Sequence, residues 1–143
     1  MRLNRYEEFE DPAGRRVRYR RRDTGGVVAV GAEVAQDATL GRETWVDPGA
    51  RVVAGARIGS HGWVEAGAVV GEQARLGRDV HVGRDAVVGA GAWVGDRTHI
   101  GARAHLAAGV ALEPDTRVPE DQDVVVAPTT PSVPAKVRRG RAA

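Results

Sequence analysis

The chain has 143 residues, with 42% apolar and 4% aromatic residues, 19 glycines and no cysteine; this length favours one domain, and the lack of cysteine excludes disulfides and thiolate metal sites. The net charge of +2 combines basic ends (+4 over residues 1–22 and +4 over 127–143) with an acidic middle (−6 over 23–126), which argues against a nucleic-acid-binding surface. No apolar run could span a bilayer or form a signal-peptide core, so we expect no membrane contact and a cytoplasmic location.

Residues 1–26 are predicted to form an N-terminal hairpin that caps the fold. Two strand-like segments, residues 6–10 and 15–19, flank the turn sequence Asp-Pro-Ala-Gly at 11–14. Glu8 and Glu10 would then lie across from arginines, and opposite charges on paired strands favour that register. We expect the hairpin to cover the first open edge of the structure that follows.

Residues 27–126 contain an internal repeat of six residues. An aliphatic residue occurs every six positions from Val28 to Val124 without interruption, the residue two before it is almost always small, and glycine often follows it. A period of six fits neither a helix nor a hairpin sheet, but it fits a short strand followed by a corner. The small and aliphatic residues would point inward, and we expect the following glycine to adopt the unusual backbone angles of the corner.

Three such sides would close a triangular coil of 18 residues, with parallel strands stacked about 4.8 Å apart from coil to coil. In this respect the chain resembles the hexapeptide-repeat superfamily, whose members form left-handed parallel β-helices. We therefore expect an all-β fold, a left-handed β-helix of about five and a half coils. The resemblance further implies a homotrimer with parallel axes and active sites in the clefts between subunits.

The 18-residue coil sorts the outward positions, each just before an inward aliphatic residue, into three columns. One column is aromatic in its middle and the other two are polar or mixed. An exposed aromatic column usually marks an interface, so we expect Trp45, Trp63, Val69 and Val87 to contact neighbouring subunits. The columns read Val27, Trp45, Trp63, His81, His99, Arg117; then Glu33, Arg51, Val69, Val87, His105, Asp123; and finally Thr39, Arg57, Arg75, Trp93, Ala111.

The favoured function is acyl transfer from acyl-CoA, as co-substrate, to a small hydroxyl or amine acceptor. Many members of the superfamily catalyse this reaction with a histidine as general base, and the resemblance assigns that role to His99 or His81. The segment Val-Pro-Ala-Lys-Val-Arg at 133–138 resembles the G-x-P-A-K segment that lies near coenzyme A in such enzymes, with Ser132 in place of the glycine. The resemblance thus implies that Pro134, Ala135, Lys136 and Arg138 lie near CoA, whereas the composition of residues 127–143 alone fits a flexible basic tail.

Two alternatives remain open from the sequence. The first is a non-catalytic scaffold, because the repeat contains no inserted loop that could enclose a substrate. The second is a zinc site similar to that of the γ-class carbonic anhydrases, with His81 and His99 of one subunit and His105 of its neighbour as ligands. In that family two of the ligands are five residues apart, whereas His99 and His105 are six apart. His61 is predicted to be an exposed corner residue.

Overall fold

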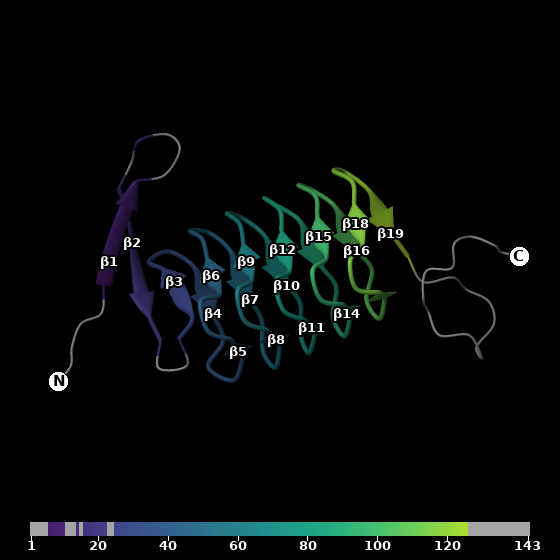
Figure 1. The fold of residues 1–143 in the computed structure, drawn as a ribbon, viewed down its shortest axis with the longest axis horizontal. Helices are drawn as coiled ribbons and strands as arrows, with labels where there is room; N and C mark the ends of the chain where they lie inside the picture. Colours follow the sequence, from purple (N-terminus) through teal and green to yellow (C-terminus); the bar gives the residue numbers. More distant parts are fainter. Residues whose placement is uncertain (1–5, 11–13, 15, 23–24, 126–143) are drawn as a thin grey trace, which may run out of the picture.

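A computed structural model describes residues 6–10, 14, 16–22 and 25–125 of the chain. These residues form strands, turns and bends, and successive coils stack along one axis from β3 to β19 (Figure 1). The fold is a left-handed parallel β-helix of about five turns, as the repeat and its resemblance predicted. Among these residues no helix has the length and the apolar character that crossing a bilayer requires.

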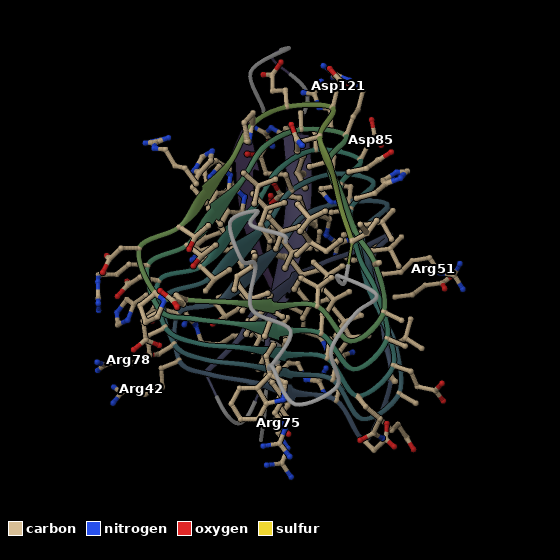
Figure 2. All side chains as sticks on the ribbon, turned by 90° about the vertical axis from the view of Figure 1, so that its right-hand side faces the viewer. Arg42, Arg51, Arg75, Arg78, Asp85 and Asp121 are labelled. Carbon is tan, nitrogen blue, oxygen red and sulfur yellow. The ribbon has the colours of Figure 1, made fainter. Side chains whose placement is uncertain are left out.

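The strands of the coils form three parallel sheets, seen end-on as a triangle in Figure 2. The first sheet contains β3 (Val27–Ala29), β6 (Trp45–Val46), β9 (Trp63–Val64), β12 (His81–Val82), β15 (His99–Ile100) and β18 (Arg117–Val118). The second contains β4 (Glu33–Val34), β7 (Arg51–Val52), β10 (Val69–Val70), β13 (Val87–Val88), β16 (His105–Leu106) and β19 (Asp123–Val124). The third contains β5 (Thr39–Leu40), β8 (Arg57–Ile58), β11 (Arg75–Leu76), β14 (Trp93–Val94) and β17 (Ala111–Leu112).

The core is a narrow prism filled by the inward residue of each strand. Val46, Val64, Val82 and Ile100 of the first sheet are fully buried, and each packs among the alanines that precede the neighbouring strands. Because strand side chains alternate between two faces, the residue before each aliphatic residue points outward. This arrangement confirms the predicted inward and outward positions.

The glycines that follow the aliphatic residues have a different role from the one predicted. The left-handed backbone angle occurs two positions later, at Gly49, Gly67, Asp85 and Arg103 in successive coils. A Cβ added to Gly83, by contrast, would lie 2.7 Å from the backbone nitrogen of the next coil at residue 102. At Gly83, therefore, the next coil approaches too closely for a side chain, and the corner does not turn there.

The N-terminal hairpin forms in the predicted register. Strand β1 (Tyr6–Glu10) pairs antiparallel with β2 (Arg16–Arg21), and Glu8 lies opposite Arg18. Strand β2 in turn pairs antiparallel with β3, so the hairpin extends the first sheet and covers its first edge. Val27, which points outward in its column, is fully buried with Tyr19 because of this cover. The division of the chain at residues 26 and 126 stays a prediction, and the predicted tail, 127–143, lies outside the described residues.

Candidate functional site

The first sheet brings Trp63, His81 and His99 into one line on its outer face. Parallel pairing places Trp63 beside His81, His81 beside His99, and His99 beside Arg117. The predicted column is therefore confirmed. The other two columns are also confirmed by the register of their sheets.

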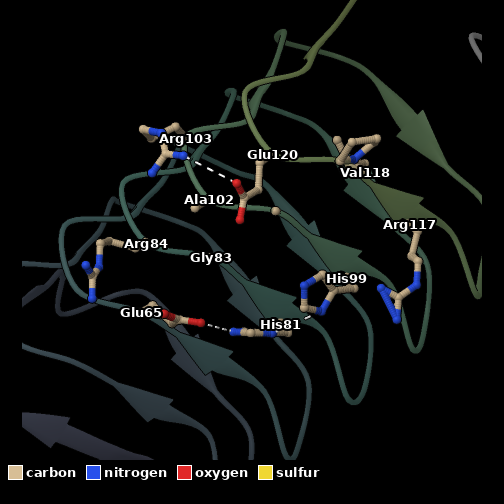
Figure 3. Close-up of a pocket in the computed structure, with 12 residues that line it drawn as sticks. Glu65, His81, Gly83, Arg84, His99, Ala102, Arg103, Arg117, Val118 and Glu120 are labelled. Atoms are coloured by element: carbon tan, nitrogen blue, oxygen red, sulfur yellow. Dashed lines mark hydrogen bonds and ion pairs between the residues drawn. The ribbon is translucent and has the colours of Figure 1, made fainter. Parts of the chain in front are cut away.

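Glu65, His81 and His99 form a hydrogen-bonded chain on this face (Figure 3). Nε2 of His81 is in short contact with Oε2 of Glu65, and Nδ1 of His81 lies 3.1 Å from Nδ1 of His99. The two imidazole rings meet edge to face, with centroids 4.5 Å apart. The side chains of Glu65 and His81 are about three-quarters buried, so water competes little for these contacts.

The hydrogen-bond chain determines which nitrogen of each neutral imidazole carries the proton. An ionised Glu65 only accepts, so Nε2 of His81 must donate to it and Nδ1 of His81 is then an acceptor. Nδ1 of His99 must donate to that acceptor, which leaves the lone pair of His99 on Nε2. Within the described part of the chain, Nε2 of His99 has no hydrogen-bond partner. It is thus a base with an available lone pair.

The surroundings of His99 favour its neutral form. Burial lowers the pKa of His99 below its ordinary value of 6.5, and the charges of His81 and Arg117 lower it further, while Glu65 acts in the opposite direction. A neutral imidazole near pH 7 is the form that can accept a proton. The electrostatic environment therefore agrees with the tautomer that the contacts require.

A groove with a volume of about 660 Å³ lies beside the two histidines. The corner that follows His81 begins with Gly83 and the corner that follows His99 begins with Gly101, and both glycines line the groove. In the preceding coil the equivalent corner position is Glu65. The groove is lined by both histidines, Glu65, the two glycines, Ala102, Val118, Pro119 and Glu120, and by three arginines, Arg84, Arg103 and Arg117 (Figure 3).

Of the three residues of the zinc alternative, His81 and His99 lie together in this chain, whereas His105 is on another sheet. His105 lies on the second sheet, exposed, with Nδ1 3.9 Å from Oδ1 of Asp123. In the described ranges no three His, Cys, Asp or Glu side chains are placed to hold a metal ion. A site that includes His105 of a neighbouring subunit, as predicted, is a question of assembly and stays a prediction.

The remaining predicted residues lie in three places. Trp63 is half-exposed and Trp45 partly buried on the first sheet, and Val69 and Val87 are partly buried on the second sheet. His61 is an exposed corner residue with φ of 60°, as expected. The predicted CoA-binding residues, Pro134, Ala135, Lys136 and Arg138, lie outside the described residues.

Sequence reasoning missed Glu65 and the groove beside the two histidines. Glu65 begins the corner after Trp63–Val64, 16 residues before His81. An acid at that offset is a readable signal, because Asp47, at the same position one coil earlier, accepts a hydrogen bond from Trp63, again 16 residues on. Gly83 and Gly101 follow the repeat like the other glycines, so the sequence holds no signal of the groove that they line.

Several solved structures resemble the chain. Perosamine N-acetyltransferase from Caulobacter crescentus, a variant in complex with CoA and GDP-perosamine, has a TM-score of 0.66 and 29% identity, over 70% of this chain and 50% of that chain. The acetyltransferase domain of PglB from Neisseria gonorrhoeae, in complex with acetyl coenzyme A, has a TM-score of 0.48 and 19% identity, over 76% of this chain and 58% of that chain. The chain therefore spans about half the length of the first of these proteins. No family model and no curated protein sequence matches it.

Proposed function

Because this chain has the repeat and the fold of the hexapeptide-repeat superfamily, we propose that it transfers an acyl group from acyl-CoA to an amine or hydroxyl of a small acceptor. The observation that carries this proposal is the chain of contacts from Glu65 through His81 to His99. In this arrangement Nε2 of His99 carries no proton, and its lone pair is available. Hexapeptide-repeat proteins include enzymes and proteins without activity, so the site and not the fold decides between them.

The reaction would proceed through general base catalysis. Nε2 of His99 takes the proton of the acceptor amine or hydroxyl while its nitrogen or oxygen attacks the thioester carbonyl carbon. The carbon–sulfur bond then breaks, CoA leaves as a thiolate, and the proton held by His99 returns to that sulfur. His99 carries a positive charge between these two steps. Its hydrogen bond to His81, and the hydrogen bond from His81 to Glu65, spread that charge.

The acyl donor is the better supported of the two substrates. The similar perosamine N-acetyltransferase was solved with CoA bound, and this chain has a groove beside the proposed base, His99. The basic segment with Pro134, Ala135, Lys136 and Arg138 is proposed to contact CoA, because CoA carries phosphates that lysine and arginine bind. The acceptor is proposed only as a small amine or hydroxyl compound.

A homotrimer would complete the site. The groove is open on the surface of one chain, and Trp63 leaves 46% of its surface exposed beside it. Partly buried Val69 and Val87 provide an apolar strip on the second sheet. Packing of the first sheet of one subunit against the second sheet of its neighbour would bury both surfaces and close the groove. A cytoplasmic location stays a prediction.

The function is tested by binding and by turnover. Calorimetric titration with acetyl-CoA should show saturable binding to the full chain, and weaker binding to a chain that ends at Pro128. Thiol release from acetyl-CoA, measured with a panel of small amines and alcohols, should fall by about 10² to 10⁴ in kcat for His99→Gln. His61→Gln, which changes an exposed corner histidine that does not line the groove, is the matched control and should keep full activity.

A non-catalytic scaffold is the second candidate, and one observation favours it. The strands from β3 to β19 follow one another at six-residue intervals, so no inserted loop covers the groove. If acetyl-CoA neither binds nor loses its acyl group, the acyltransferase proposal is wrong and the scaffold is favoured. Zinc that stays bound after desalting would instead favour the metal alternative.

A further inference from the structure

Trp63 makes two specific contacts beside the histidine pair. Its ring lies flat against the imidazole of His81, with centroids 4.7 Å apart and planes inclined by only 10°. Its Nε1 donates a hydrogen bond of 2.9 Å to Oδ2 of Asp47. The hydrogen bond to Asp47 therefore holds the indole in its orientation, and one face of the indole covers one face of the His81 ring.

Asp47 connects this tryptophan to the N-terminal hairpin. Its second oxygen, Oδ1, accepts a hydrogen bond of 3.0 Å from the hydroxyl of Tyr19 in β2. Tyr19 is only 8% exposed and meets Trp45 edge to face at 5.0 Å. One carboxylate thus joins a buried residue of the hairpin to the ring that stacks on His81.

The orientation of the His81 ring matters because its two nitrogens have different partners. A half-turn of the ring about its Cβ–Cγ bond would exchange Nδ1 with Cδ2 and Nε2 with Cε1. Carbon atoms would then face Glu65 and His99, and both contacts would be lost. Nδ1 of His99 would then lose the acceptor that holds its proton, so the proton could move to Nε2. A proton on Nε2 would remove the lone pair that the proposed base requires.

We propose that Trp63 is a positioning residue for His81, held in place by Asp47 and Tyr19, so that the N-terminal hairpin forms part of the site that keeps His99 in its basic tautomer. The role in catalysis rests on the proposed function; the role in orienting the ring does not. The exposed half of the indole is still available to a neighbouring subunit, so a contact there is compatible with this role.

The first test observes the histidine tautomers directly and needs no activity. Nitrogen-15 NMR of the imidazoles at alkaline pH, where histidine is neutral, should show His81 protonated on Nε2 and His99 on Nδ1. In Trp63→Ala both should shift toward a mixture of tautomers. Trp93→Ala is the matched control, since Trp93 also occupies an outward strand position but lies on the third sheet over Arg75; it should leave both signals unchanged.

Conservative variants separate ring orientation from general stability. Trp63→Phe keeps an aromatic face but loses the Nε1 hydrogen bond, and it should restore most of the wild-type tautomer pattern. Asp47 accepts one hydrogen bond on each carboxylate oxygen, from Tyr19 and from Trp63, and Asp47→Asn leaves only one oxygen that can accept. This variant should give a change in tautomer pattern between those of Trp63→Phe and Trp63→Ala. These variants also keep the test valid if Trp63→Ala does not fold.

The kinetic test measures kcat and KM for acetyl-CoA separately. Trp63→Ala should lower kcat at least tenfold with an unchanged KM, because misplacement of a catalytic group by about 1 Å can cost up to 10²-fold, and Trp63→Phe should recover most of it. Wild-type tautomers in Trp63→Ala would overturn the inference. If the wild-type chain transfers no acyl group while the tautomers shift as expected, the proposed function has failed but the positioning role stands.

Discussion

At the scale of single residues, the neutral form of His99 is the property on which the proposed chemistry depends. Burial is the largest cause of its lowered pKa, followed by the charges of His81 and Arg117. The folded protein therefore binds fewer protons than the unfolded chain in the interval between that lowered pKa and 6.5. Stability rises with pH across this interval and is lost as the pH falls through it.

Arg117→Gln should raise the pKa of His99, because it removes one positive charge from beside the ring while burial is unchanged. Proton NMR titration of the His99 ring checks this shift. The acidic limb of kcat/KM should move to higher pH, and the interval in which stability depends on pH should become narrower. An unchanged or lower pKa of His99 in this variant would contradict the electrostatic account. Arg51→Gln, on the second sheet and paired with Glu33, is the control.

At the scale of the strand and corner, two glycines of one corner have different roles although they are two residues apart. A Cβ at Gly89 would lie 2.6 Å from the backbone nitrogen of Ala108 and 2.6 Å from the carbonyl oxygen of Leu106 in the next coil. Gly91 has open space around it but a φ of +70°. The first glycine is required for coil stacking and the second for the turn of the backbone.

Substitution of these two glycines should separate the two requirements. Gly89→Ala should lower the free energy of unfolding by about 1 to 3 kcal/mol, because the coils must move apart. Gly91→Ala should lower it by about 1 to 2 kcal/mol, because alanine disfavours the left-handed backbone angle. Asparagine tolerates the left-handed angle, so Gly91→Asn should recover part of the loss while Gly89→Asn should not. Urea unfolding measures all four. Equal rescue by asparagine at both positions would show that the corner angle, and not the contact, requires Gly89.

The hexapeptide pattern allowed the strands and their register to be predicted. Each column recurs after 18 residues only if no loop interrupts the coil, and no interruption was visible in the sequence. The hydrogen bond between Glu65 and His81 was not predicted, because it depends on a side chain that reaches from a corner to the neighbouring coil. The site was therefore predicted as two histidines without the acid that orients them.

At the scale of the whole molecule, the hairpin terminates the β-helix at its first coil. Strand β2 occupies the edge of β3, which would otherwise present unpaired backbone groups. The same hairpin buries Val27 and supplies Tyr19 to the network around Trp63. It thus connects protection of the sheet edge with the arrangement of the site.

Removal of residues 1–24 should therefore make the protein associate end to end. The exposed edge of β3 would pair with the edge of another copy, and the apolar surface around Val27 and Trp45 would favour that contact. Analytical ultracentrifugation should show species larger than those of the full chain, which should sediment as a trimer of the 15.1-kDa chain. If the truncated chain forms assemblies with the same number of subunits as the full chain, the hairpin does not have this role.

The periodic residues alone predicted the β-helix, its three columns and the alignment of Trp63, His81 and His99, because a strict six-residue repeat permits one register of parallel strands. The repeat contains no information on which long side chains meet across coils or on what the hairpin covers. Those depend on packing in three dimensions: Glu65 reaches His81 past a corner, Asp47 joins Tyr19 to Trp63, and the corners after His81 and His99 line one groove. The direction of the His81 ring, and with it the lone pair of His99, follows from these contacts between coils and not from the periodicity that placed the residues.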